Sequence, residues 1–264
     1  MRDILLLRFE APLMAFGGVL VDHRGFITEH PAQSLVAGLF ANALGWDHAD
    51  QERIQALQDR LRLASRCDLP GERLVDFHTV DLGQDFMLAG WTTRGAPEGR
   101  SGGSAKEGTH IRERHYHADR VQTLAVTLDG DGTPTIDDLD GALLAPARPL
   151  FLGRKTCLPS RPLRLGRVQA DSTIAALQSA PRYAHPGRQS RGSPRPLAAC
   201  WPKDETGPEA SRIEPVTDER DWHNQIHSGR RLVCMGLIDP PPGEPSMSGP
   251  CYQPRAADRN ALNA

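Results

Sequence analysis

The sequence His115-Tyr116-His117 combines residue types that could do chemistry. If this segment is a β-strand, both imidazoles point to the same face, because side chains alternate along a strand. Two imidazoles and a third ligand such as His110 could bind zinc. However, no carboxylate or cysteine follows at the spacing of a catalytic zinc site, which needs three protein ligands. We therefore expect no metal site, and interpret the cluster as polar side chains at a strand end or as RNA contacts.

A second candidate is the sequence Gly153-Arg154-Lys155-Thr156, in which a glycine precedes two cations. Its spacing departs from that of a P-loop, because an arginine separates the glycine from the lysine. A glycine lets the backbone come close to an oxygen anion, and backbone N–H groups bind such anions. The segment is therefore predicted to bind phosphate groups, and we expect no cofactor.

An enzymatic alternative stays open. A metal-independent ribonuclease needs a general base near a ribose 2′-hydroxyl group. The side chains of His78, His115, Tyr116 and Lys155 could serve, and their spacing selects none of them. The sequence shows no Ser-His-Asp order and no nucleophile elbow.

The distribution of charge favours a polyanionic partner. The 264 residues include 31 Lys and Arg against 33 Asp and Glu, a formal net charge of −2. From Arg148 to Arg195, ten basic residues stand against one acid, Asp171, whereas five aspartates and no base lie between Asp129 and Asp140. Such a basic stretch attracts a polyanion through counterion release, unless the acidic segment neutralises it in space.

Length and composition are typical of a globular protein with a sizeable core. The longest aliphatic run, Ile4 to Leu7, is far shorter than a membrane span, and the N-terminus does not resemble a secretory signal. The five cysteines are odd in number and form no C-x-x-C pair. We therefore expect no disulfide framework and a location in the reducing cytoplasm.

Hydrophobic periodicity predicts an α+β fold, in which helices on one face back an antiparallel sheet. A ferredoxin-like arrangement is the obvious candidate. Residues 12–31 are predicted to form a glycine-punctuated loop, 92–113 a projecting insertion, and 181–196 a second mobile loop. Strands are predicted over residues 3–9, 61–67, 73–80, 120–128, 163–169 and 232–238, and helices over 34–45, 51–61, 136–144 and 172–179.

Six segments together match the pattern of one protein family in order and approximate spacing. They cover most of residues 1–170 and resemble the CasD (Cas five) family of the type I-E CRISPR systems. The C-terminal third matches poorly, apart from Arg220-Asp221-Trp222 and the last strand. The matching segments are Leu5 to Gly17, Pro31 to Gly45, Arg66 to Asp68, Asp76 to Val80, Arg114 to Asp119 and Leu152 to Cys157.

The resemblance implies a subunit of Cascade, an antiviral ribonucleoprotein surveillance complex. It implies a ferredoxin-like (RRM-like) RNA-binding domain over residues 1–238 with a long inserted thumb at about 81–118. Residues 239–264, which begin with Asp-Pro-Pro-Pro-Gly and have few apolar residues, are predicted from composition to form a disordered tail. The chain would bind the 5′ handle of the guide RNA (crRNA) and contact the large subunit CasA and the backbone subunit CasC. It would share the complex with CasB and CasE, and would meet target DNA through that complex.

The resemblance also bears on catalysis and on the site residues. CasE cleaves the precursor RNA in this branch, so a non-catalytic role is expected, whereas relatives in the type I-C branch are endoribonucleases. A general single-stranded RNA binder is a third possibility. Ala32-Gln33 replaces the usual Thr-Arg before Ser34, which could simply be a helix cap. The residues expected near the RNA are Arg24 and Ser34 at the glycine loop, with Arg112, Arg114, Tyr116, Arg154 and Lys155.

Overall fold

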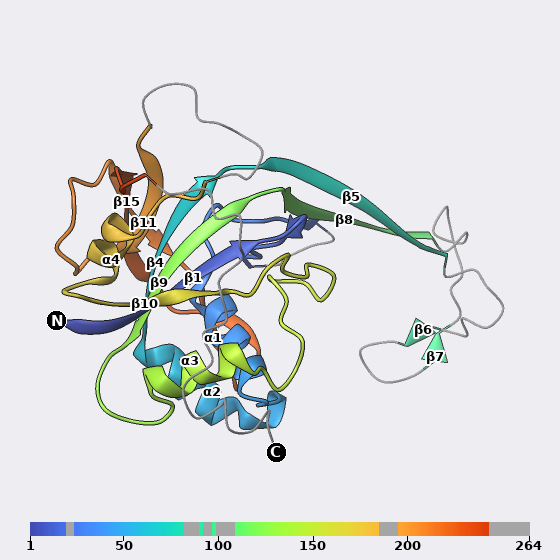
Figure 1. The fold of residues 1–264 in the computed structure, drawn as a ribbon. Coiled ribbons are helices and arrows are strands. Elements are labelled where there is room, and N and C mark those ends of the chain that lie inside the picture. The colour runs from blue at the N-terminus through green and yellow to red at the C-terminus, as the bar shows by residue number, and fades with distance from the viewer. Residues whose placement is uncertain (20–23, 82–89, 92–96, 99–108, 185–194, 243–264) are drawn as a thin grey trace, which may run out of the picture.

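The computed structural model describes residues 1–19, 24–81, 90–91, 97–98, 109–184 and 195–242. A seven-stranded sheet forms its centre, and every neighbouring pair of strands in it is antiparallel (Figure 1). The predicted α+β class with an antiparallel sheet is therefore confirmed. From one edge to the other, the strands are β10 (Arg164–Ala170), β1 (Arg2–Glu10), β9 (Val121–Leu128), β4 (Leu61–Leu69), β11 (Leu197–Pro202), β15 (Arg231–Ile238) and β12 (Arg212–Val216).

Helices cover both faces of this sheet, so the prediction that they lie on one face is wrong. Three of them pack on one face, and α4 packs on the other, where Ile174 and Leu177 contact a separate apolar cluster with Ile4 and Leu6. In the described part of the chain, no helix is both long and apolar enough to cross a membrane. The helices are α1 (Gln33–Ala43), α2 (Gln51–Arg60) after the short 3-10 turn η1 (His48–Asp50), α3 (Ile136–Leu144) and α4 (Thr173–Ser179).

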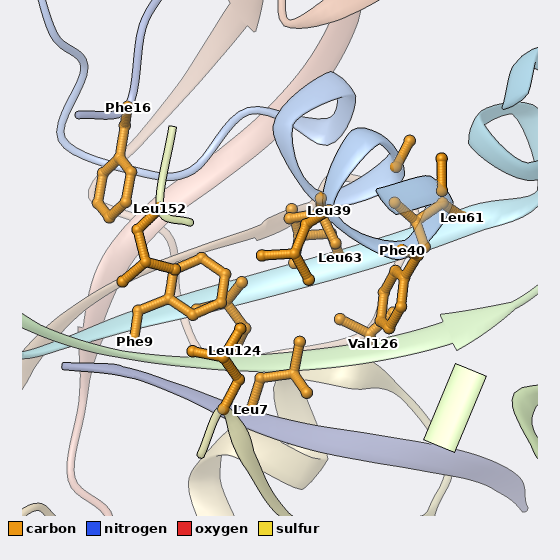
Figure 2. Packing of buried hydrophobic residues seen from close by; sticks show 14 of the residues in the cluster. Leu7, Phe9, Phe16, Leu39, Phe40, Leu61, Leu63, Leu124, Val126 and Leu152 are labelled. Atoms are coloured by element: carbon orange, nitrogen blue, oxygen red, sulfur yellow. The ribbon is translucent and has the colours of Figure 1, made fainter. Parts of the chain in front are cut away.

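Strand β1 is buried from both sides, which explains its unbroken apolar run. Leu7 and Phe9 face the larger cluster, where they pack with Leu39 and Phe40 of α1 (Figure 2). Leu6 points to the opposite face, because side chains alternate along a strand. Each fully buried side chain of this kind contributes roughly 1.5–3 kcal/mol. The two clusters together hold the central strands in register.

A long hairpin extends from the main sheet (Figure 1). Its two strands pair over their whole length, and two short strands join β8: one is antiparallel at the base, and one is parallel at the middle of β8. Most of the insertion predicted at 92–113 lies outside the described residues, but residues 109–113 belong to β8. The strands outside the main sheet on this side are β5 (Glu72–Asp81), β8 (Thr109–Ala118), β2 (Leu13–Met14), β3 (Arg24–Gly25), β6 (Gly90–Trp91) and β7 (Pro97–Glu98).

The C-terminal third contains strands that periodicity did not predict. β11 and β12 complete the main sheet, and β13 (Glu219–Asp221) pairs with β14 (Ile226–Ser228) as a small hairpin. Residues 185–194 of the predicted mobile loop and residues 243–264 of the predicted tail lie outside the described residues.

The first turn of α1 is held from a distant part of the chain. Its N-cap is Ala32, whose side chain makes no capping hydrogen bond, so the interpretation of Ser34 as a cap is wrong. Instead, the backbone N–H of Gln33 donates to Asp218 Oδ2 (3.1 Å) and that of Ser34 donates to the Asp218 carbonyl oxygen (3.0 Å). The buried Gln33 amide donates to two carbonyl oxygens at the end of α2. Gln33, which stands where the family usually has arginine, therefore has a structural role in joining α1 to the end of α2.

Candidate functional site

Gly17 and Gly18 lie where three hollows of the surface meet. The sheet cavity, of about 640 Å³, lies between residues 27–32 and β12. The helix cavity, of about 620 Å³, lies between α1, residues 151–155 and the β13–β14 hairpin. The hairpin cavity, of about 190 Å³, lies beside residues 112–114 of β8. Because the two glycines carry no side chains, a ligand can approach their backbone closely from each hollow.

The helix cavity has the charge that a phosphate-bearing ligand requires. Among the described residues that line it, four carry a permanent positive charge, and Asp47 is the one carboxylate. Two tryptophans, Trp46 and Trp222, also line it, so that cations and aromatic rings share one hollow. Arginine and lysine beside aromatic rings are typical of single-stranded nucleic-acid sites. The four cations are Arg148, Arg154, Lys155 and Arg220.

Lys155 stands at the apex of a tight turn on the rim of the helix cavity. It is exposed, and no ion pair of its side chain is found among the described residues. The turn is closed by hydrogen bonds from Leu152 N–H to the Cys157 carbonyl oxygen and from Cys157 N–H to that of Arg154 (both 2.8 Å). Gly153 has a φ of +95°. The turn therefore leaves the Lys155 side chain exposed at the helix cavity, and the phosphate contact expected of this segment stays a prediction.

Arg154 has a different role from its neighbour, because the fold already uses its donors. Its Nη1 donates to the His115 carbonyl oxygen (2.8 Å) and its Nη2 to that of Gly25 (3.1 Å). Its guanidinium group also lies over the Tyr116 ring, 4.5 Å from the centroid. Arg154 therefore ties β3, β8 and the 151–155 segment together, and it lines both the helix cavity and the hairpin cavity.

Tyr116 lies beneath Arg154 and is only 4% exposed. Its ring belongs to the apolar core, so we reassign it from an RNA contact to a support of Arg154. On the opposite face of β8, the His115 ring contacts Phe26 in a tilted arrangement (centroids 5.0 Å apart), and His117 is buried, with Nε2 2.9 Å from the Thr28 carbonyl oxygen. Among the described residues, no group of three His, Cys, Asp or Glu side chains is placed to hold a metal ion.

The remaining predicted residues gather around the hairpin cavity and α1. Arg112 and Arg114 line the hairpin cavity, together with Arg154. Arg24 Nε lies 3.6 Å from Glu113 Oε2, and β3 pairs with β8 at this point. Ser34, which is 8% exposed, lines the helix cavity. Five of the seven predicted residues thus line the helix cavity or the hairpin cavity, whereas Arg24 and Tyr116 line neither.

The basic stretch after Arg148 does not form a single basic face. Arg164 Nε lies 2.5 Å from Asp140 Oδ1, and Arg167 pairs with Asp3 and Asp137. Hydrogen bonds to those two carboxylates raise the pKa of Arg167. The acidic segment 129–140 therefore neutralises part of the stretch in space, which was the alternative that the sequence left open.

Sequence reasoning missed the β13–β14 side of the helix cavity. Trp222 Nε1 donates to Gln58 Oε1 (3.0 Å), and the same oxygen accepts the backbone N–H of Arg220 (3.1 Å). A Cβ added at Gly38 would lie 3.4 Å from the Trp222 ring, so α1 and this hairpin are in close contact. The signal that could have found this side was the Arg220-Asp221-Trp222 match in an otherwise dissimilar C-terminal third.

The sheet cavity differs from the helix cavity in charge. Its cations are paired with acids that also line it: Arg73 and Arg120 with Glu29, and others on β12 and β15 in the same way. His30 lines it too, with Nδ1 2.7 Å from Ser65 Oγ. Burial, reinforced by the charge of Arg120, lowers the pKa of His30 to about 4, so its ring is neutral at pH 7. Its four arginines and three carboxylates leave the sheet cavity a formal charge of +1, whereas the four cations and one carboxylate of the helix cavity sum to +3.

Comparisons with known proteins agree on one family. A family model described as CRISPR-associated protein (Cas_Cas5) matches residues 4–234. The protein "CRISPR system Cascade subunit CasD" of Escherichia coli (strain K12) is 32% identical over 179 residues, which is 67% of this chain and 76% of that relative.

Solved structures show the same similarity in three dimensions. A chain of a "CRISPR RNA-guided surveillance complex" has a TM-score of 0.65 and 25% identity, and the match covers 92% of this chain and 95% of that one. A second structure, "Crystal structure of Cas protein", has a TM-score of 0.59 and 23% identity over 92% of this chain and 99% of that one. The second match shows a shared fold.

Proposed function

The chain belongs to the Cas5 family of CRISPR-associated proteins, and from this premise we propose that it binds the 5′ handle of a guide RNA as a subunit of a type I-E Cascade surveillance complex. The helix cavity and the hairpin cavity hold the RNA backbone on either side of Gly17 and Gly18. The complex, rather than this chain alone, meets the target DNA. Four free, buried cysteines, Cys67, Cys157, Cys200 and Cys234, support a location in the reducing cytoplasm.

The observation that carries this proposal is the charge of the helix cavity. Four cations and one carboxylate line it in the described part of the chain, beside Trp46 and Trp222. Single-stranded RNA is recognised by such a combination, since cations contact phosphates and aromatic rings stack on bases. Of the two rings, the half-buried Trp46 is the one open to a base, because Trp222 is 7% exposed and belongs to the core. Lys155 is the cation most open to a phosphate, and Gly17 and Gly18 let the RNA backbone come close.

We assign the chain a non-catalytic role, because the candidate general bases do not converge. His78 pairs with Arg112, four positions along β8 from Tyr116, which is about 14 Å at the rise of a strand. His115 and Tyr116 point to opposite faces of β8, and Tyr116 is buried. A shared position for a 2′-hydroxyl group is therefore not formed by these side chains.

Incubation with repeat RNA in EDTA tests the non-catalytic assignment. We expect the full-length chain to leave the RNA intact over hours, with a known metal-independent ribonuclease as the positive control. A site-specific cut that disappears in the His115→Ala variant, while the folded state is unchanged, would establish the endoribonuclease alternative instead.

The β5–β8 hairpin supports the assembly role. It extends from the main sheet and carries exposed apolar side chains, including Val75, Phe77 and Ile111. A protein partner covers such side chains more readily than RNA does. In this proposal the hairpin is the thumb of a ferredoxin-like subunit, and the chain joins the large subunit CasA to the backbone subunit CasC.

The Lys155→Glu substitution is expected to weaken RNA binding about tenfold, since a hydrogen bond to a charged group contributes roughly 1.5 kcal/mol. The measurement is fluorescence anisotropy of a labelled repeat-derived 5′ RNA titrated with the full-length chain at several salt concentrations. Because one phosphate contact is lost, the slope of log K against log salt should become shallower by about 0.7.

Lys203→Glu is the matched control, because Lys203 is also exposed and lies outside the three cavities. It makes the same change in net charge and should leave affinity within about twofold of the wild type. If Lys155→Glu and Lys203→Glu lose the same RNA affinity, binding depends on net charge alone. The helix cavity would then not be the RNA site.

A further inference from the structure

We propose that the sheet cavity receives one unstacked nucleobase of the RNA whose backbone crosses Gly17 and Gly18, with His30 as a hydrogen-bond donor to the base edge. This inference rests on the proposed function and assigns the sheet cavity a separate task within it. The sheet cavity would recognise a base, whereas the helix cavity binds phosphate.

Continuity between the cavities is the first observation. Gly17 and Gly18 line both the sheet cavity and the helix cavity, so a chain bound over these residues has a hollow on each side. No side chain stands between the two hollows at these positions, and an added Cβ at Gly17 would meet no atom within 4 Å. A nucleotide can therefore place its phosphate on one side and its base on the other.

The charges on the two sides separate the two tasks. Four arginines line the sheet cavity, and each is within 3.0 Å of a carboxylate that lines the same cavity. Internal pairing leaves these guanidinium groups little attraction for phosphate, because an added anion would compete with a carboxylate already in place. The ion pairs are Arg73 and Arg120 with Glu29, Arg212 with Glu214, and Arg231 with Asp218.

The floor of the sheet cavity is apolar. Ala198 and Cys200 of β11, with Val233 and Met235 of β15, contribute to it. Helices α1, α2 and α3 pack over β1, β9 and β4. The neighbouring strands β11 and β15 of the same sheet line the cavity instead. Its volume of about 640 Å³ lies within the range of small-molecule sites, roughly 300–1,000 Å³. A flat, uncharged ring is the group of an RNA that suits an apolar floor of this size.

His30 supplies the polar contact. Its Nδ1 lies 2.7 Å from Ser65 Oγ and accepts from Gln122 Nε2 at 3.2 Å. Because both neighbours can donate to Nδ1, we assign the ring proton to Nε2, for which no hydrogen-bond partner is found among the described residues. A single N–H donor above an apolar floor recognises an acceptor on a base edge, as in the splayed-out bases of single-stranded RNA sites.

The test uses a variant whose larger side chain fills the sheet cavity, and RNAs that each lack one base, to identify which base is displaced. Ala198 is exposed at the floor, so Ala198→Phe adds a ring without disturbing the core, and Ala198→Ser is the size control. The full-length chain is titrated against repeat-derived 5′ RNAs, each with one abasic nucleotide. In the wild type, we expect one abasic position to weaken binding about tenfold, in the range of a base stacked in a protein site.

In Ala198→Phe, intact RNA should bind about tenfold more weakly, and the penalty for that abasic position should fall below twofold, since the base no longer enters. Ala198→Ser should keep the wild-type profile. An unchanged abasic profile in Ala198→Phe overturns the inference. The inference is also overturned if Ala198→Phe binds RNA normally but another subunit is lost from the purified complex. That result would mean that the sheet cavity holds a protein segment.

A second measurement uses the wild type alone, in case Ala198→Phe fails to fold. Chemical probing of the bound RNA should show one nucleotide whose base edge is protected although its neighbours react. Reaction of every base edge would contradict the inference. If the base-pocket inference fails but wild-type RNA binding depends on Lys155, the proposed function still stands. If the wild-type protein binds no repeat RNA, the proposed function itself is wrong.

Discussion

Arg66→Met is expected to lower the free energy of unfolding by about 3–5 kcal/mol, the range for removing one partner of a buried ion pair. Arg66 is fully buried on β4, and its Nη2 lies 2.9 Å from Asp68 Oδ1. Its guanidinium group also donates to the carbonyl oxygens of Leu177, Ala180 and Pro181, at 2.7–2.9 Å. The variant leaves the Asp68 carboxylate without its cation and three carbonyl groups without a donor. Urea unfolding followed by circular dichroism measures the loss.

Arg62 on the same strand provides the comparison. It pairs with Asp204, whose side chain is 68% exposed, and water screens such a pair. Arg62→Met should therefore cost at most about 1 kcal/mol. A double variant, Arg66→Met with Asp68→Leu, should recover part of the stability, because the Asp68 charge is then no longer buried without its partner, whereas the three carbonyl groups still lack a donor. If Arg66→Met and Arg62→Met cost the same, burial of the Arg66–Asp68 pair does not add the stability expected of it.

Gly153→Ala is expected to lower the free energy of unfolding by about 3 kcal/mol or more and to weaken RNA binding. A Cβ at this position would lie 1.8 Å from the Ala15 carbonyl oxygen, so the backbone must move. The φ of +95° adds strain of roughly 1–3 kcal/mol for a residue with a side chain. Any displacement of this turn also moves Lys155 away from the helix cavity. Urea unfolding and RNA anisotropy, both at a temperature where the variant is folded, measure the two effects.

Gly130→Ala is the control that separates the cost of a positive φ from the cost of a steric clash between the new Cβ and the backbone. Gly130 also has a positive φ (+68°), but an added Cβ there would meet no atom within 4 Å. We expect a loss of about 1 kcal/mol and unchanged RNA affinity, because only the backbone preference is altered. Comparable losses for the two glycine variants would show that the contact between Gly153 and Ala15 is not what holds the turn.

Local patterns determined most of the regular elements. The apolar run Ile4 to Leu7 predicts a buried strand, and β1 is such a strand, although its burial on both faces was not predicted. The amphipathic spacing of Ile54 and Leu57 predicts α2, since that face packs on the core. Such patterns predict secondary structure because the spacing of apolar residues within one segment determines which face of that segment is buried.

The short strands of the C-terminal third needed long-range partners. β12 contains two charged residues and a proline, so its sequence carries no strong strand signal, and only pairing with β15 makes it a strand. β13 and β14 have three residues each and are fixed by contacts of Arg220 and Trp222 with Gln58 on α2. Tertiary pairing decided these elements, because segments so short gain little stability alone.

The candidate site divides in the same way. The sequence by itself determined which binding groups are present: cations after Gly153 and glycines in the loop before α1. Only the tertiary structure decided which cations remain available, since Arg154 is bound by two carbonyl groups and Arg167 by two carboxylates, whereas Lys155 is open. The physical reason is that Coulomb attraction and hydrogen bonding depend on distance in space, and positions along a chain do not fix that distance.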